Sequence, residues 1–167
     1  APNRERFLDD FINNKVYYTV QRNLEAQGKS LTIDEQTLRK LSLAAGVMSR
    51  VARVRDGIDE QEHTMIVSKL QETWQLSAEE AELVATAATS PQVANMDTFR
   101  TAREFFEMCT QDELTSFAET LFEVAAADGM VTRDEIEEIR AITKTLLLSH
   151  EQFIAAKLTI PREKREE

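Results

Sequence analysis

An Asp-Gly turn followed by a glutamate is the part of the sequence whose residue types point most directly to chemistry. Asp128 and Gly129 are followed, seven residues after the aspartate, by Glu135. This spacing matches the second half of an EF-hand loop, in which glycine makes the sharp turn and glutamate binds calcium through both oxygens. The positions of the first two ligands hold Val124 and Ala126, which offer no side-chain oxygen. The sequence therefore excludes an EF-hand, although an exposed acidic cluster can still hold a hard cation weakly, with water as the remaining ligands.

Helix capping gives the same residues a structural explanation. Gly129 suits the left-handed residue that ends a helix, and Thr132 with Glu135 has the spacing of a capping box that opens the next helix. Asp128 fits less well, because a carboxylate at a helix C-terminus faces the negative end of the helix dipole. Both explanations stay open at this point, so Asp128 and Glu135 are candidate metal ligands only.

A second acidic turn lies nearer the middle of the chain. Asp56 begins another Asp-Gly pair, and Asp59 with Glu62 again has the spacing of a capping box. In a gapless alignment of the two turns, Arg55 stands where Asp128 stands, so Asp56 is displaced by one position, about 100° around a helix. Asp56 and Glu62 are therefore the weaker metal candidates, and Arg55 would partly neutralise them.

Catalytic arrangements are not readable elsewhere in the chain. His63 and His150 each follow a predicted helix start and have no second ligand at helical spacing, so both are interpreted as surface histidines. Cys109 lies on an apolar helix face and is interpreted as a small core residue. We therefore predict a protein that is not an enzyme and has no certain cofactor. A metal-assisted enzyme of unknown type, built on the acidic clusters, is the last alternative.

Charge and cysteine content narrow the class of protein further. The net charge of −10 repels phosphate backbones and argues against a nucleic-acid partner, whereas it favours cations and basic protein surfaces. A single cysteine, no signal-peptide pattern and no long apolar run favour the cytoplasm. Peripheral attachment to the inner membrane is the alternative location.

The spacing of apolar residues predicts an all-α fold. Helical periodicity recurs along the chain, and capping-box signatures precede several of the periodic stretches, the first at Thr32 and Glu35. Only 4 Gly and 3 Pro are present, which favours long helices over a turn-rich β fold. We predict a bundle of about eight helices with short connections, at residues 4–26, 33–54, 60–74, 78–89, 98–109, 111–127, 133–147 and 150–158.

An internal repeat is visible in the sequence. Residues 51–66 and 124–139 align without gaps, and each is followed by a Leu-Ser pair that opens another helix. This pattern predicts an internal duplication about a pseudo-twofold axis. The predicted organisation is an N-terminal amphipathic helix in residues 1–30, a domain in residues 31–158 with units at about 33–89 and 110–158, and a frayed, charged tail in residues 159–167.

The N-terminal helix has two readings. Its apolar residues recur every four positions, at Leu8, Ile12, Val16, Val20 and Leu24. Such a stripe predicts packing on the body of the domain. The alternative is association, either as a homodimer through this helix or at a membrane surface. Acidic residues dilute its basic character, which makes membrane binding the weaker alternative.

Three segments resemble the bacterial tellurite-resistance TerB-like family: VAAADGMVTRDEIEEI at 124–139, VARVRDGIDEQEH at 51–63 and LLLSHEQFIAAKL at 146–158. The resemblance covers about residues 33–158. It implies an all-helical duplicated fold, acidic residues at the inter-helix turns proposed to bind metal, and a place in stress complexes in the cytoplasm or at the membrane. Carried onto this sequence, those acidic positions are Asp128, Glu135 and Glu62, with Asp56 matching after a one-residue shift.

The residues and the resemblance together define the functional hypotheses. The first is a non-enzymatic binding or regulatory module that contacts a protein partner, including a membrane-associated one, in a metal- or tellurite-stress response. The alternative is a divalent metal-ion binder or sensor that uses the acidic inter-helix turns. Direct action on tellurite is disfavoured, because the negative charge of the protein repels an anion.

Overall fold

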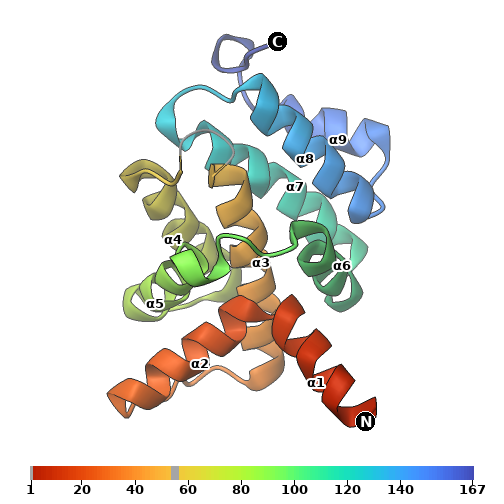
Figure 1. The fold of residues 1–167 in the computed structure, drawn as a ribbon. Coiled ribbons are helices and arrows are strands. Elements are labelled where there is room, and N and C mark those ends of the chain that lie inside the picture. Colours follow the sequence, from red (N-terminus) through yellow and green to blue (C-terminus); the bar gives the residue numbers. More distant parts are fainter. Residues whose placement is uncertain (1, 54–56) are drawn as a thin grey trace.

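The computed structural model of the chain describes residues 2–53 and 57–167. Asp56, one of the candidate metal ligands, lies outside the described residues, as does Arg55. Within the described residues the fold is all-α, as predicted, and contains no β-strand (Figure 1). The helices are α1 (Pro2–Asn13), α2 (Lys15–Gln27), α3 (Glu35–Arg53), α4 (Glu60–Trp74), α5 (Ala78–Ala88), α6 (Thr98–Met108), α7 (Gln111–Ala125), α8 (Arg133–Thr145) and α9 (His150–Lys157), with 3-10 helices η1 (Pro91–Val93), η2 (Ala126–Asp128) and η3 (Arg162–Lys164).

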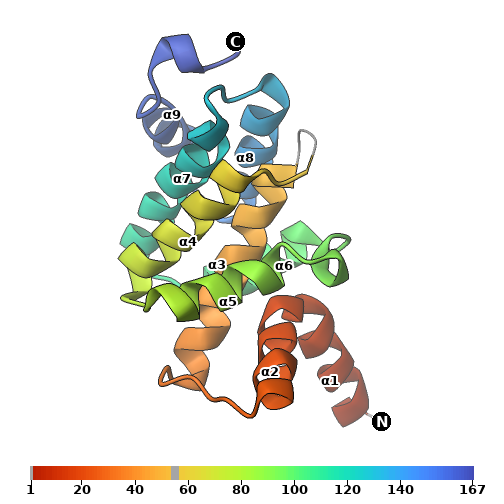
Figure 2. The ribbon, with the colours of Figure 1, turned by 90° about the vertical axis from the view of Figure 1, so that its left-hand side faces the viewer.

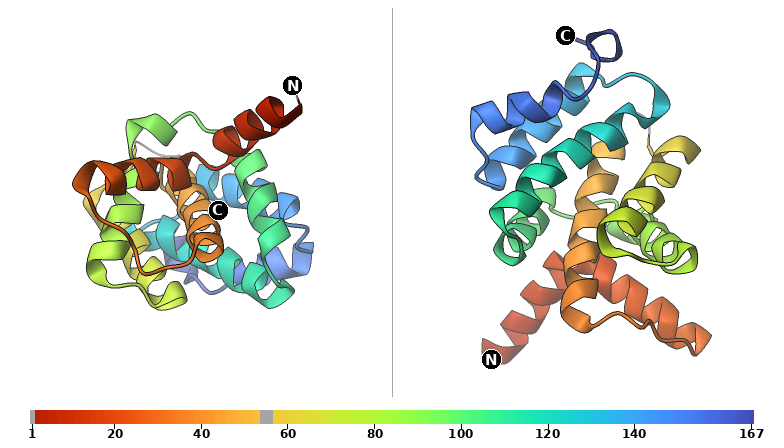
Figure 3. Two further views of the ribbon diagram at one scale, coloured as in Figure 1. Left: turned by 90° about the horizontal axis from the view of Figure 1, so that it is seen from below. Right: turned by 180° about the vertical axis from the view of Figure 1, so that it is seen from behind.

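Helix α3 forms the centre of the bundle. Every residue from Leu41 to Ser49 is buried, so this helix is enclosed on all sides rather than on one face. Helices α4 and α5 lie on one side of it, α6 and α7 on the other, and α2 beneath it in the view of Figure 1. Seen from below, α3 stands near the middle of the molecule (Figure 3). The single core therefore runs along α3 and joins the two predicted units.

Capping boxes set most of the helix starts. Boxes with both reciprocal hydrogen bonds open five of the described helices, at Asp59/Glu62, Ser77/Glu80, Thr110/Glu113, Thr132/Glu135 and Ser149/Gln152. The predicted box at Thr32 is wrong, because α3 begins at Glu35 and the carboxylate of Asp34 caps it. That carboxylate accepts a hydrogen bond from the Thr37 amide at 2.8 Å.

The N-terminal segment is broken at Asn14, which corrects the prediction of one helix over residues 4–26. Asn14 has φ −123° and ψ 40°, outside the helical region. Its side-chain amide donates to the backbone oxygen and to the Oδ1 atom of Asp10, both at 3.1 Å. An asparagine side chain that bonds a nearby carbonyl competes with the regular helical hydrogen bonds. As a result, α1 and α2 run in different directions (Figure 2).

Only the second half of the predicted N-terminal stripe packs on the body of the domain. Val16, Val20 and Leu24 of α2 are buried, whereas Leu8 and Ile12 of α1 are 50% and 37% exposed. Apolar residues of α2 are therefore part of the core, whereas the outer face of α1 is exposed. None of the described helices is both long and apolar enough to cross a membrane.

The two predicted units share local structure at the corners that precede α4 and α8. Gly57 and Gly129 both have positive φ, at +96° and +116°, and a capping box follows each. Gln75 and Leu147, just after these two helices, are both left-handed. The duplication about a pseudo-twofold axis stays a prediction, since similar corners do not by themselves establish a symmetry axis.

The C-terminal tail is held against the second corner, contrary to the predicted frayed end. The Val131 amide donates to the Lys164 oxygen at 2.8 Å, and the Glu166 amide donates to the Val131 oxygen at 2.9 Å. Ile160 is buried in the core. The tail therefore fixes the backbone between Gly129 and the start of α8.

Candidate metal centre

Three carboxylates from two parts of the chain meet at one corner of the bundle. Asp59 and Glu62 stand at the start of α4, and Asp128 is the last residue of η2. One oxygen atom from each of the three carboxylates lies within 4.8 Å of the other two. Helix α4 lies beside α7, whose end leads into η2 (Figure 2). The cluster therefore combines both predicted units, although the sequence favoured a site within the second unit.

The candidate ligands differ in where the structure places them. Glu62 and Asp128 are brought together, and Asp59 joins them, although the sequence analysis interpreted Asp59 only as part of a capping box. Glu135 is fully buried nearby, and its negative charge acts on Glu62. It is not one of the three grouped carboxylates. Asp56, the fourth candidate ligand, lies outside the described residues.

A tight turn positions Asp128. Helix α7 ends at Ala125 and is followed directly by the 3-10 helix η2. Gly129 then reverses the direction of the chain. The Gly129 amide donates to the Ala126 oxygen at 2.9 Å. The φ of +116° at Gly129 is a conformation that a residue with a Cβ atom rarely adopts. The glycine that the EF-hand comparison singled out is therefore needed to bring Asp128 to the start of α4.

A capping box positions Glu62. The Asp59 carboxylate accepts a hydrogen bond from the Glu62 amide at 2.8 Å, and Glu62 Oε1 accepts one from the Asp59 amide at 3.2 Å. The Glu62 side chain is almost fully buried, with 2% of the residue exposed. Its second oxygen, Oε2, is buried and has no hydrogen-bond partner among the described residues. Leaving a buried polar atom without a partner costs roughly 1–3 kcal/mol, and more when the group is charged.

Capping alone does not explain this burial. In the boxes that open α5, α7 and α9, the third-position residues Glu80, Glu113 and Gln152 are only partly buried, yet both capping hydrogen bonds form. Glu62 and Glu135 are the buried members of the same motif. Helix capping therefore explains the position of Glu62 Oε1, which accepts the capping hydrogen bond. It does not explain why Oε2 is buried.

The electrostatics of the corner are unfavourable to a bare carboxylate. Burial is the main cause that raises the pKa of Glu62 to about 7. The hydrogen bond from the Asp59 amide lowers this pKa, and the negative charges of Asp59, Asp128 and Glu135 raise it further. A positive ion at this corner would offset all of the raising effects together.

The chemistry of the cluster favours a hard divalent cation. All three groups offer carboxylate oxygen, the ligand that Ca²⁺, Mg²⁺ and Mn²⁺ prefer, and no imidazole or thiolate belongs to the group. Two surface hollows adjoin the corner. One of about 400 Å³ reaches Asp59, and the other, of about 430 Å³, reaches Ala127 beside Asp128. Glu60 lines both hollows, and Glu62 and Asp128 line neither, so of the three grouped carboxylates only Asp59 borders a hollow.

The other reactive residues have ordinary surroundings. His63 Nε2 lies 2.8 Å from Glu82 Oε1, and the ring of His150 stacks on Phe153 with the ring centroids 6.3 Å apart. Burial raises the pKa of the Cys109 thiol to about 11, so it stays protonated at neutral pH and is a poor nucleophile. The described residues therefore add no nucleophile and base pair to the acidic corner.

Comparisons with known proteins agree with the fold. The sequence model of a family described as "Tellurite resistance protein TerB" matches residues 41–158, more than half of the chain. No curated protein and no solved structure matches the chain. The matched range contains all three residues of the acidic corner and excludes α1 and α2.

Proposed function

The chain belongs to the TerB family of tellurite resistance proteins, and from this premise we propose that it is a non-enzymatic module that binds one divalent cation between Asp59, Glu62 and Asp128. The observation that carries the proposal is the buried Glu62 Oε2 atom, which has no hydrogen-bond partner among the described residues. A cation supplies the missing partner and offsets the repulsion among the carboxylates.

The expected ion is Ca²⁺, Mg²⁺ or Mn²⁺, held with modest affinity. Three carboxylates supply fewer ligands than a full calcium site, so water completes the coordination. Sites of this kind bind with dissociation constants on the order of 10⁻⁵–10⁻³ M. Because the ligands come from the start of α4 and the end of η2, the bound ion would link the two halves of the domain.

Calorimetric titration with calcium, magnesium, manganese and zinc tests the proposal. We expect Glu62→Gln and Asp128→Asn each to weaken binding at least about tenfold, since even partners outside the ligand shell cost 10–100-fold. Glu80→Gln is the matched control, because it changes the same position of a partly exposed capping box. Equal heats for wild type, Glu62→Gln and Asp128→Asn would reject the site.

A second proposed role is regulation through a protein partner during metal or tellurite stress. The net charge of −10 supports a basic partner surface. A cation at the corner would change the local charge and so affect the partner's affinity. Affinity capture from tellurite-challenged cells, with and without a chelator, tests this role. A captured set of proteins that is the same for wild type, Glu62→Gln and chelated protein would contradict coupling between the ion and the partner.

A further inference from the structure

Helix α1 carries an apolar ridge that the rest of the chain covers only in part, since Phe7 contacts the Tyr18 ring and the outer face stays exposed. Phe7, Leu8 and Ile12, the α1 ridge, are 60%, 50% and 37% exposed. Helix α1 lies with α2 at the end of the molecule opposite the C-terminus (Figures 1 and 2). Apolar side chains of this size clustered on one short helix are typical of an interaction surface rather than of an ordinary exterior.

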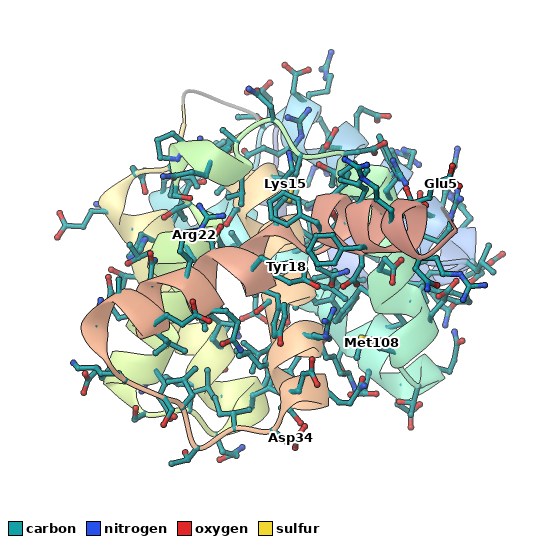
Figure 4. All side chains as sticks on the ribbon, turned by 60° about the horizontal axis from the view of Figure 1, so that its bottom comes forward. Glu5, Lys15, Tyr18, Arg22, Asp34 and Met108 are labelled. Carbon is teal, nitrogen blue, oxygen red and sulfur yellow. The ribbon has the colours of Figure 1, made fainter. Side chains whose placement is uncertain are left out.

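The position of α1 is fixed by polar contacts rather than by burial of the ridge. Asp10 accepts a hydrogen bond from Arg39 of α3 at 3.0 Å and another from the Tyr18 hydroxyl. Asn13 of α1 donates to Glu104 of α6 at 3.1 Å. Figure 4 looks onto this end, with Tyr18 near the break between the two helices. These contacts hold the ridge outward, so it cannot fold back over its own domain without breaking them.

A pocket elsewhere on the molecule is concave and apolar, whereas the α1 ridge is convex and apolar. The α4–α7 pocket, of about 320 Å³, is lined mainly by residues of these two helices, with single residues from α3 and α6. Its apolar lining consists of Met48, Trp74, Phe105 and Phe117. A cavity of about 150 Å³ already accepts a benzene ring. The pocket is therefore large enough for a phenylalanine or leucine side chain from outside.

One basic residue beside the ridge and one acidic residue on the pocket rim have complementary charges. Asp112 on the pocket rim is exposed and makes no ion pair within the part of the chain that the structure describes, whereas the rim lysine, Lys69, is already paired with Glu72 and Glu123. On α1, Arg4 stands three and four residues before Phe7 and Leu8 and so shares their side of the helix. Arg4 is likewise exposed.

We propose that the α1 ridge of one copy docks in the α4–α7 pocket of a second copy, with Arg4 of the first paired to Asp112 of the second. The ridge and the pocket are different surfaces of the same chain, so a closed dimer contains the contact twice, once in each direction about a twofold axis. Reciprocal exchange between two copies closes a dimer with two such contacts. A homodimer of this kind differs from a seam in which two α1 helices face each other, because each copy needs both surfaces.

Sedimentation equilibrium over a wide range of protein concentration, in chelator, tests the docking. We expect wild type to self-associate and Leu8→Glu, which blocks the ridge, to raise the dimer dissociation constant more than about 30-fold. Ser116→Trp, which fills the pocket from an exposed position, should have the same effect. Leu158→Glu is the matched control, because Leu158 is 60% exposed at the end of α9. It should associate like wild type.

A charge exchange tests the pairing itself. Arg4→Asp and Asp112→Arg should each weaken association about 2- to 5-fold, as expected for a partly exposed ion pair. The double variant should recover the wild-type constant. A wild type that stays monomeric at millimolar concentration would overturn the proposal. So would association that Leu8→Glu abolishes but Ser116→Trp leaves unchanged, which would instead indicate an α1–α1 seam. Because chelator is present throughout, neither result bears on the cation site.

Discussion

The capping boxes at the starts of α4 and α5 use the same hydrogen bonds in different surroundings. In α5, Ser77 and Glu80 cap the helix at the surface. In α4, Asp59 and Glu62 make the equivalent bonds, but Glu62 is buried beside two further carboxylates. The difference shows that a motif sufficient to start a helix has, at α4, been placed where its charge is unfavourable. Under the proposed function, a bound ion would recover the stability lost there.

The largest expected effect is on the stability of the ion-free protein. In chelator at pH 8, Glu62→Gln should raise the free energy of unfolding by roughly 3 kcal/mol. The substitution removes a buried carboxylate, and burial raises the pKa of this carboxyl group from 4.5 to about 7. The cap should survive, since Gln152 fills the same position in the box of α9. Urea unfolding measures the change. Glu80→Gln should stay within about 0.5 kcal/mol of wild type, and a destabilised Glu62→Gln would contradict the comparison.

The pH dependence of stability should differ between the same variants. The pKa of Glu62 is higher in the folded state than its ordinary value of 4.5, so the folded state binds the proton more tightly. This favours folding below pH 4.5, and the benefit is lost as pH rises through about 7. Unfolding curves between these pH values should therefore show wild type losing stability relative to Glu62→Gln. Parallel pH profiles would show that Glu62 does not titrate as described.

Adding the ion should reverse the disadvantage of the α4 box. At a free cation concentration of 100 times the dissociation constant, wild type should gain about 2.7 kcal/mol of stability. Glu80→Gln should gain the same amount, and Asp128→Asn should gain much less. Thermal unfolding against calcium or manganese concentration measures this gain. An equal gain in Asp128→Asn would place the ion elsewhere.

The smallest expected effect comes from converting one box into the other. Asp59→Ser gives α4 the Ser-x-x-Glu box of α5 and keeps a good N-cap. Its stability in chelator should therefore change by only about 0.5 kcal/mol, whereas Ser77→Ala, which removes a cap, should cost about 1 kcal/mol. Cation binding should weaken in Asp59→Ser and stay unchanged in Ser77→Ala. Urea unfolding and calorimetry on the two variants separate capping from ion binding.

Local patterns predicted most of the fold. Apolar periodicity and capping boxes identified the helices because both depend on residues within one or two turns. The break at Asn14 was missed because the apolar stripe continues through it, whereas the Asn14 backbone leaves the helical region and its side chain bonds to Asp10. The cap of α3 was misplaced by two residues for a similar reason, since Asp34 and Thr32 both suit the position.

The candidate site was only partly predictable. The acidic residue types and the Asp-Gly turn directed attention to Asp128 and Glu62, but Asp59 was assigned to capping alone. The approach of α4 to η2 depends on the packing of both helices around α3, which no spacing within one segment encodes. The N-cap aspartate of α4 was no distinguishing signal, because aspartates also cap α3 and α6.

The position of a bound ion tests the central claim most directly. Crystals grown with Mn²⁺ should show an anomalous difference peak about 2.0–2.6 Å from carboxylate oxygens of Asp59, Glu62 and Asp128, and the peak should be absent from crystals of Glu62→Gln. An ordered corner without a peak at saturating Mn²⁺, or a peak that persists unchanged in Glu62→Gln, would contradict the account.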